Sequence, residues 1–214
     1  MIPLLHDFDG ETVLVVGGGR VGARKARRFA READVVVVSP DFADADFGGA
    51  ERIRARPDAE SVEEWVDRTD PVLVVAATDD AAVDDAVEAA TRERNVLVNR
   101  ADRSGQRDAG SVVVPATVRE DPVVAAVATG GTSPALSRAL RERLEPVVEN
   151  AGAMADLTAE LREDLKERLP AEKRRAVLRR VVRDETVWKG LDSGSSNLEQ
   201  RVSDVITDVT GDSS

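Results

Sequence analysis

Long apolar runs alternate with amphipathic segments through the first hundred residues of the chain. Three of these runs are continuous and rich in valine: Val13–Val16, Val35–Ser39 and Val72–Ala77. A strand that is buried on both faces has this composition, because neither of its faces needs polar residues. Two weaker strands are expected at Arg52–Arg56 and Leu97–Asn99. This alternation predicts an α/β fold, a Rossmann-type doubly wound parallel sheet.

The segments between these strands carry apolar residues at the spacing of an amphipathic helix. A first helix is expected from Val21 to about Arg31, with its arginines on the solvent side. A short helix is expected at Val62–Val66, and Thr78 or Asp79 is expected to cap the helix that follows the third apolar run. Ahead of the first strand, four apolar residues are expected to cover an edge of the sheet: Ile2, Leu4, Leu5 and Phe8.

The pattern changes after the fifth strand. A charged loop is expected at Arg100–Gly110, followed by two strands, Ser111–Val114 and Pro122–Thr129, with a turn at Arg119–Asp121. A helix should then begin at Ser133, the N-cap, with Pro134 as its first helical residue. These elements form a small α+β segment.

From Ala151 onward the chain is expected to be helical. An apolar stripe is expected to form core or a subunit interface: Met154, Leu157, Leu161 and Leu165. Another helix follows Pro170, a break of small residues is expected at Gly190–Ser196, and a last helix at Leu198–Val209. We therefore place region boundaries after residues 112 and 150.

A glycine-rich turn joins the first strand to the first helix. Gly17-Gly18-Gly19-Arg20-Val21-Gly22 fits the G-x-G-x-x-G pattern, with a strand before it and a helix after it. Gly17 permits the tight turn, Gly19 lets the backbone approach a pyrophosphate, and Gly22 lets the helix pack against the strand. The helix N-terminus offers N–H groups to the phosphates. The pattern predicts a dinucleotide site; a turn that binds no phosphate is the alternative.

The second strand ends in Ser39-Pro40-Asp41 and so lacks a clear terminal acid. Asp41 is still close enough in sequence to reach a ribose hydroxyl, which favours NAD over NADP. The predicted cofactor-binding residues are Gly17, Gly19, Arg20, Val21, Gly22, Ser39, Asp41, Phe42 and Thr78.

Composition narrows the class of protein. The 214 residues include 41 acidic and 30 basic ones, for a net charge of −11. This charge argues against a nucleic-acid partner, and an acid-rich, lysine-poor chain is typical of a halophilic cytoplasm. The chain has no cysteine and one histidine, so we expect no metal site built on thiolates or several histidines. No apolar run reaches about 18 residues and no secretory leader is recognisable, so we expect a cytoplasmic protein without a membrane partner.

Candidate catalytic chemistry follows the fifth strand. Asp102 lies just past that strand, at the edge where doubly wound sheets bind ligands. A carboxylate there can accept a proton as a hydride leaves, although aspartate is also common in turns. Gly130–Ser133 is either an anion site at a helix N-terminus or a plain capped turn. Arginines concentrate between Arg100 and Arg141, which favours a substrate with carboxylates; a solvated charged face is the alternative.

Together these motifs resemble the precorrin-2 dehydrogenase family, which includes the amino-terminal module of siroheme synthase. The resemblance covers about residues 1–150. It rests on V-V-G-G-G-R-V from Val15, A-A-T-D-D from Ala76, Asn99 with Asp102, Pro115-Ala116, and T-G-G-T-S-P from Thr129 with Arg138 and Arg141.

The resemblance implies an NAD-dependent oxidation of precorrin-2 to sirohydrochlorin by a homodimer. It implies that Asp102 is catalytic, as a base or as an acceptor that orients the substrate. The implied substrate-binding residues are Asn99, Arg119, Gly130, Gly131, Thr132, Ser133, Arg138 and Arg141. The regions then become an NAD-binding domain (1–112), a dimerisation and substrate segment (113–150) and a C-terminal helical domain (151–214).

Two departures and two alternatives accompany the resemblance. The loop Arg103–Gly110 is longer than is usual in the family, and Ser111 stands where an aromatic residue is common. Some family members also insert iron, but the lack of cysteine and of a second histidine favours dehydrogenation alone. A module that senses NAD without catalysis is the alternative function. An unrelated small-acid dehydrogenase is a further alternative, but this chain lacks the histidine or lysine base that such enzymes usually use.

Overall fold

The computed structural model describes residues 2–103, 110–193 and 197–211. It divides into two compact units. The first contains Met1–Val114 and Gly130–Thr132, and the second contains Pro115–Thr129 and Ser133–Ser214. The region boundaries after residues 112 and 150 stay a prediction. We describe each unit by itself.

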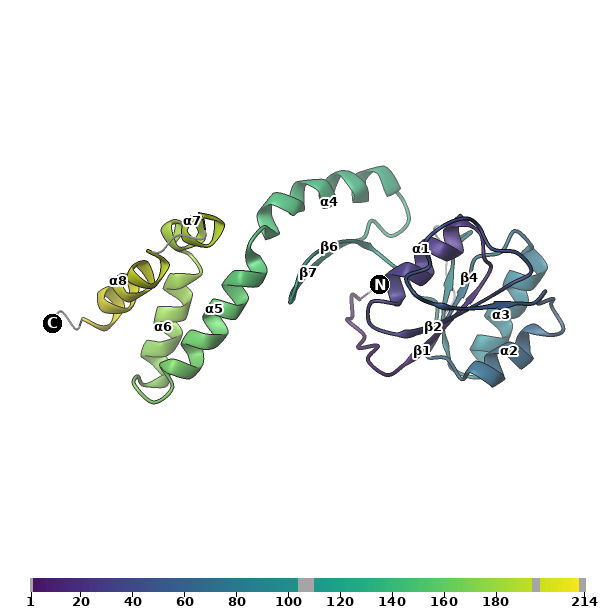
Figure 1. Ribbon diagram of the computed structural model, residues 1–214, viewed down its shortest axis with the longest axis horizontal. Coiled ribbons are helices and arrows are strands. Elements are labelled where there is room, and N and C mark those ends of the chain that lie inside the picture. Colours follow the sequence, from purple (N-terminus) through teal and green to yellow (C-terminus); the bar gives the residue numbers. More distant parts are fainter. Residues whose placement is uncertain (1, 104–109, 194–196, 212–214) are drawn as a thin grey trace. The chain divides into compact units, whose positions relative to one another are not determined.

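A five-stranded parallel sheet forms the centre of the first unit (Figure 1). In chain order, its strands are β1 (Thr12–Val16), β2 (Asp34–Ser39), β3 (Glu51–Arg54), β4 (Leu73–Ala76) and β5 (Leu97–Arg100). Their spatial order is β3-β2-β1-β4-β5. The order reverses direction between β1 and β4, which is where doubly wound sheets bind ligands. The predicted Rossmann-type sheet is confirmed.

Alternate residues of the central strand β1 build two separate cores. Leu14 and Val16 pack on one face with α2 (Val62–Thr69) and α3 (Ala81–Glu93). Val13 and Val15 pack on the other face with α1 (Arg20–Phe29). Figure 1 shows α1 on one side of the sheet and α2 and α3 on the other. Because side chains alternate along a strand, a fully apolar run is needed to fill both cores.

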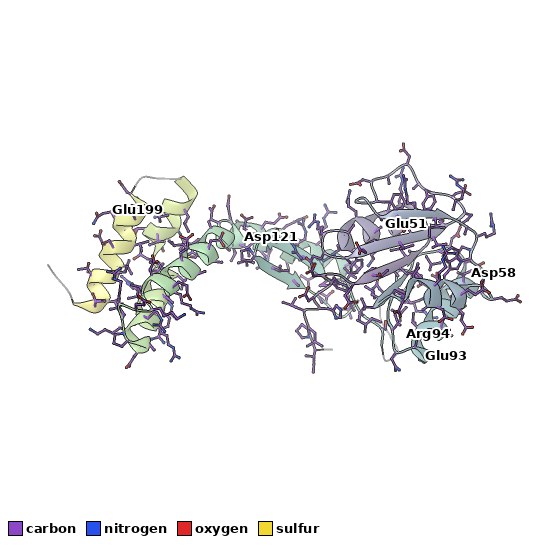
Figure 2. All side chains as sticks on the ribbon, turned by 60° about the horizontal axis from the view of Figure 1, so that its bottom comes forward. Glu51, Asp58, Glu93, Arg94, Asp121 and Glu199 are labelled. Atoms are coloured by element: carbon purple, nitrogen blue, oxygen red, sulfur yellow. The ribbon has the colours of Figure 1, made fainter. Side chains whose placement is uncertain are left out.

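The second unit begins with an antiparallel hairpin of β6 (Ala116–Glu120) and β7 (Val123–Val127). Helix α4 (Pro134–Val148) packs against both strands, and α5 (Ala151–Asp164) follows it. Asp121, labelled in Figure 2, lies in the hairpin turn. A Cβ on Gly152 would lie 2.2 Å from the Asp121 carbonyl oxygen, so glycine lets α5 pack directly against this turn.

The helices at the end of the chain share one apolar core. They are α5, α6 (Ala171–Val181), α7 (Glu185–Ser193) and α8 (Leu198–Thr210). Three residues of the predicted stripe are buried in this core, Met154, Leu161 and Leu165, and Leu157 packs against it. The stripe is therefore core, and the helical C-terminal part of the fold is confirmed.

The strand predicted at Ser111–Val114 is wrong. This segment forms one isolated bridge to β5, between Val98 and Ser111, and the hairpin strand begins later, at Ala116. The predicted turn is also shifted, because Arg119 and Glu120 still belong to β6. The hairpin turn is thus confined to the two residues after Glu120.

Two further predictions fail for packing reasons. The helix α7 runs through Gly190 to Ser193, where a break was expected; a Cβ on Gly190 would lie 3.1 Å from Leu198 Cδ1, so glycine lets α8 approach. The rest of that expected break lies outside the described residues. At the N-terminus, Ile2, Leu4 and Leu5 are 85–89% exposed and cover no sheet edge. Only Phe8 packs as expected, edge-on against Phe29.

Candidate active site

The glycine turn after β1 is fixed by close backbone contacts. Gly17 has a φ of +117°, and a Cβ there would lie 2.3 Å from the carbonyl oxygen of Ala77, just past β4. A Cβ on Gly22 would lie 1.9 Å from the carbonyl oxygen of Gly17. Both positions therefore exclude any side chain, since Cβ atoms do not approach other atoms so closely. These contacts hold the first turn of α1 against the end of β1.

Gly19 is different, because its surroundings are open. It is the N-cap of α1 with a φ of −71°, and a Cβ there would meet no atom within 4 Å. Among the residues that the structure describes, no side chain caps this helix end with a hydrogen bond. Arg20 and Val21 follow as the exposed first residues of α1. Free space beside an uncapped helix N-terminus fits a pyrophosphate, which accepts hydrogen bonds from the first backbone N–H groups.

The loop after β2 wraps around Gly18. Ser39 is buried at the end of β2, and a Cβ on Gly18 would lie 2.7 Å from its Cβ and 2.8 Å from Phe42 Cδ1. The N–H of Ala43 donates to the Gly18 carbonyl oxygen at 2.8 Å. Asp41 is exposed, and its carboxylate forms an ion pair with Arg54 at 3.4 Å. The structure thus brings three predicted cofactor residues, Ser39, Asp41 and Phe42, beside the glycine turn.

Thr78 lies just past β4, and a buried carboxylate holds it. Its hydroxyl donates to Asp84 Oδ1 at 2.7 Å and its N–H donates to the same oxygen at 3.3 Å. Burial raises the pKa of Asp84, although the hydrogen bonds from Thr78 oppose this shift. The N-cap of α3 is neither Thr78 nor Asp79 as predicted. It is Asp80, whose carboxylate accepts from the N–H of Ala82 at 2.9 Å.

Asn99 presents an unsatisfied acceptor near the end of β5. Its side chain is buried, and its Nδ2 donates to the Val112 carbonyl oxygen at 2.8 Å. Its Oδ1 is also buried and has no hydrogen-bond partner among the described residues. Buried polar atoms are almost always paired. A bound molecule with an N–H or O–H donor would satisfy this oxygen.

Asp102 lies two residues past β5, as expected, and Arg100 binds both of its oxygens. Arg100 Nε donates to Asp102 Oδ1 at 3.0 Å, and Arg100 Nη2 donates to Oδ2 at 2.8 Å. This paired guanidinium lowers the pKa of Asp102, although partial burial opposes the shift. The Asp102 side chain is 42% exposed, so it remains accessible to a substrate.

The burial of Arg100 was not predicted from the sequence. This residue was assigned to a charged loop, but it is the last residue of β5 and its side chain is only 3% exposed. Helix α3 supplies Asp85 and Glu88, which accept from Arg100 Nη1 at 2.6 and 3.2 Å. The i, i+3 spacing of these two acids was the available signal, since it places them on one helix face.

The remaining predicted substrate residues lie on β6, in the turn before α4 and on α4. Gly130 and Gly131 have φ values of +64° and +84°, and they lead to Ser133, whose side chain caps α4 by accepting from the Leu136 N–H. Thr129 closes this turn, because its hydroxyl donates to the Ser133 carbonyl oxygen at 3.0 Å. The predicted N-cap at Ser133 is confirmed. Thr132 is exposed in the same turn.

The predicted substrate arginines all contact nearby carboxylates. Arg138 donates to Glu142 at 2.9 Å, and Arg141 pairs with Glu145, both along α4. Arg119, on β6, pairs with Asp121 at 3.3 Å. Since α4 packs against β6, these arginines belong to one compact unit. The positive charge predicted from the sequence is therefore balanced locally by acids.

Comparison with known proteins shows the family to which this chain belongs. Residues 4–116 match a family described as putative NAD(P)-binding. A precorrin-2 dehydrogenase of Methanosarcina barkeri is 30% identical, over 96% of this chain and 93% of its own length. The chain belongs to the precorrin-2 dehydrogenase family. The predicted family is confirmed.

Two further relatives define the extent of the similarity. A siroheme synthase of Nitrosospira multiformis is 37% identical over 81% of this chain, but the chain spans only 38% of that protein. A solved structure titled SirC, precorrin-2 dehydrogenase, has the same fold. It has a TM-score of 0.69 and 24% identity, and the match covers 97% of this chain and all of the other.

No helix in the described ranges is long and apolar enough to cross a membrane. Among the same residues, no group of three or more histidines and carboxylates is arranged to hold a metal ion.

Proposed function

We propose that this chain oxidises precorrin-2 to sirohydrochlorin and uses NAD⁺ as the hydride acceptor. The observation that carries this proposal is the extent of the similarity to a precorrin-2 dehydrogenase. It covers nearly the whole of both chains and therefore includes the part beyond the cofactor domain. The overall reaction converts precorrin-2 and NAD⁺ into sirohydrochlorin, NADH and one proton.

The glycine turn holds the cofactor. The open space at Gly19 and the uncapped start of α1 accept the pyrophosphate, with Arg20, Val21 and Gly22 supplying the first helical N–H groups. Ser39, Asp41 and Phe42 would hold the adenosine half, and Thr78 would lie beside the nicotinamide half. The exposed carboxylate of Asp41 favours a ribose hydroxyl over a 2′-phosphate, because like charges repel.

Asp102 contributes mainly through its negative charge. A carboxylate with a lowered pKa is a weak base, and Arg100 keeps Asp102 in its charged form. NAD⁺, when bound, accepts a hydride from the substrate. The departure of that hydride leaves positive charge on the macrocycle, and a fixed anion beside it stabilises the transition state. Asn99 Oδ1 is a second acceptor that can orient an N–H group of the substrate or the cofactor.

The glycine turn before α4 and three arginines recognise the substrate's carboxylates. Ser133 and the turn formed by Gly130, Gly131 and Thr132 offer hydroxyl and backbone N–H donors. Arg119, Arg138 and Arg141 exchange a carboxylate of the protein for one of the substrate. Arginine suits this role, since its guanidinium binds carboxylates through two parallel hydrogen bonds.

The active protein is a homodimer that associates through α4 and the hairpin. No residue of α4 is buried, and Leu136 and Val147 are 49% and 67% exposed. The hairpin strands also contain no fully buried residue. An amphipathic helix on a half-buried hairpin is a surface that a second copy can cover, because two copies bury the same apolar patch against each other.

The protein works in a halophilic cytoplasm. Its net charge of −11 and its four lysines suit high KCl, where dissolved ions screen the repulsion between carboxylates. Assays should therefore be run in multimolar KCl. A fold that is kept in KCl and lost on dilution would support this assignment, whereas indifference to salt would contradict it.

The decisive experiment mixes purified protein, precorrin-2 and NAD⁺, and follows NADH together with the absorption spectrum of sirohydrochlorin. Turnover by the wild type supports the proposal. Bound NAD⁺ with no turnover would instead favour the sensing module. Asp102→Ala should reduce kcat strongly while the affinity for NAD⁺ is kept. Full activity in that variant would remove Asp102 from the catalytic role.

Arg138→Ala tests the substrate site separately. Arg138 is 80% exposed and contacts only Glu142 in the described structure, so its loss should leave the fold intact. We expect the KM for precorrin-2 to rise about tenfold, because one charge-assisted contact is lost, with the KM for NAD⁺ changed less. The opposite pattern would exclude Arg138 from the substrate site.

A further inference from the structure

Arg100 is a buried cation, and its burial needs an explanation. Removing a guanidinium from water is costly unless carboxylates surround it and satisfy its donors. Its side chain is 3% exposed, and three carboxylates accept from its nitrogens at 2.6 to 3.2 Å. Two of these carboxylates come from α3 and the third is that of Asp102.

The two acids of α3 bridge a pair of arginines. Asp85 Oδ1 accepts from Arg100 Nη1 at 2.6 Å and from Arg103 Nη2 at 2.9 Å. Glu88 Oε2 accepts from Arg100 Nη1 at 3.2 Å and from Arg103 Nη1 at 2.9 Å. Glu88 is itself buried, with a side chain that is 10% exposed. This network of hydrogen bonds places the Nη1 side of Arg100 against the helix.

Because Nη1 is held by the helix, the opposite edge of the planar guanidinium faces Asp102. That edge carries Nε and Nη2, which are the two donors that bind the Asp102 carboxylate. A guanidinium has a rigid fork geometry, so fixing one edge fixes the direction of the other. The plane of the Asp102 carboxylate is thereby set by residues of α3 that do not touch it.

We propose that Asp85 and Glu88 are positioning residues for Asp102 and act through Arg100. The proposal rests on the proposed function, since it assigns the orientation of Asp102 a role in precorrin-2 oxidation. Neither acid contacts the carboxylate that they direct. Their contribution is to keep Arg100 from rotating, so that Asp102 presents its remaining lone pairs in one direction when the substrate arrives.

Electrostatics supports this arrangement. Arg100 from β5 and Arg103 from the following loop act on Asp102 as positive charges, and Asp84 from α3 interacts with it as a negative one. Asp85 and Glu88 from α3 bind Nη1 of Arg100. The hydrogen bonds from Arg100 dominate and lower the pKa of Asp102. Loosening the fork should therefore raise that pKa toward its ordinary value.

The test compares the double variant Asp85→Asn/Glu88→Gln with a matched control. The control is Asp67→Asn, which removes a carboxylate that binds Arg94 at 2.6 Å between α2 and α3. Asp67 and Asp85 have similar side-chain exposures, 62% and 60%. Figure 2 labels Arg94, the first residue after α3. Both variants keep the size of each side chain and remove only charge.

We expect the double variant to lose about tenfold in kcat, because a misdirected carboxylate stabilises the transition state less. The KM for NAD⁺ should change less than about twofold, since no phosphate contact is altered. Rates are normalised to the number of NAD⁺-binding sites, so a loss of folded protein is not read as a loss of kcat. Asp67→Asn should keep the wild-type kcat.

A second variant keeps the proposal falsifiable if the double variant does not fold. Arg100→Lys keeps the positive charge but cannot donate the parallel pair of hydrogen bonds. Its kcat should fall, and the acidic limb of its pH–rate profile should move to higher pH. The positioning role would be overturned if the double variant and Arg100→Lys both kept the wild-type kcat. It would also be overturned if Asp67→Asn lost as much kcat as the double variant.

The wild-type assay separates the two proposals. If the wild type binds NAD⁺ but does not oxidise precorrin-2, the proposed function fails, and the positioning role fails with it. If the wild type is active and the variants match it, only the positioning role fails.

Discussion

Gly19 and Gly22 lie in the same turn, yet the structure predicts opposite outcomes when each is changed to alanine. At Gly22 the new Cβ would lie 1.9 Å from the carbonyl oxygen of Gly17. Two backbone segments would have to separate by about 1 Å, and overpacking of this kind costs about 3 kcal/mol. We expect Gly22→Ala to lower the Tm of the first unit by about 10 °C.

At Gly19 the same methyl group would meet no protein atom within 4 Å, and the φ of −71° suits alanine. Alanine is a slightly poorer N-cap than glycine, so the loss of stability should stay below about 1 kcal/mol. The methyl group would nevertheless fill the space that the pyrophosphate needs. We expect Gly19→Ala to keep its Tm and to raise the Kd for NAD⁺ at least about tenfold.

The assay uses the position of the two tryptophans. Trp65 lies in α2 of the first unit and Trp188 lies in α7 of the second. In a Trp188→Phe background, fluorescence during heating reports the first unit, and calorimetric titration gives the Kd for NAD⁺. The reasoning is refuted if Gly19→Ala binds NAD⁺ like its parent, or if Gly22→Ala keeps the parental Tm.

Two other predictions concern charge and association. Burial raises the pKa of Asp84 in the folded protein, so its stabilising contribution is present below the ordinary value of 3.8 and is lost as the pH rises through the raised pKa. As the pH rises above about 4, the free energy of unfolding should therefore fall less for Asp84→Asn than for the wild type. An equal dependence of this free energy on pH in the two proteins would contradict the prediction. The double variant Leu136→Asp/Val147→Asp should be monomeric by light scattering with an unchanged helical content, and a mass equal to that of the wild type would exclude α4 from the dimer interface.

The sheet was predictable from the sequence because burial on both faces leaves no alternative composition. Val13–Val16 and the two apolar runs after it must fill two cores at once, so nearly all of their residues are apolar. The glycine turn was equally predictable, since Gly17 and Gly22 face contacts that no other residue tolerates. In both cases the residues that the local sequence pattern requires are the same residues that the packing requires.

Arg100 was not predictable in the same way. An arginine after an apolar run normally marks the return of the chain to solvent, and its burial depends on acids that lie 12 and 15 residues earlier in the sequence. The strand predicted at Ser111–Val114 is wrong because an apolar segment need not be a strand. Its apolar character suits a strand, but Val112 packs against the first unit and its N–H bonds to Val98 rather than to a hairpin partner. Such outcomes depend on tertiary contacts that one sequence does not display.

The unsatisfied oxygen of Asn99 has a consequence for how this protein can change. A buried acceptor that has no partner among the described residues costs about 1–3 kcal/mol of stability. Val75, which is paired with Asn99 on the neighbouring strand β4, is fully buried, so this face of the sheet accommodates an apolar side chain at the same depth. An apolar residue at position 99 should therefore stabilise the fold, and it should weaken the ligand contact that we propose for Asn99. The proposed contact and the stability of the fold make opposing demands at this one position.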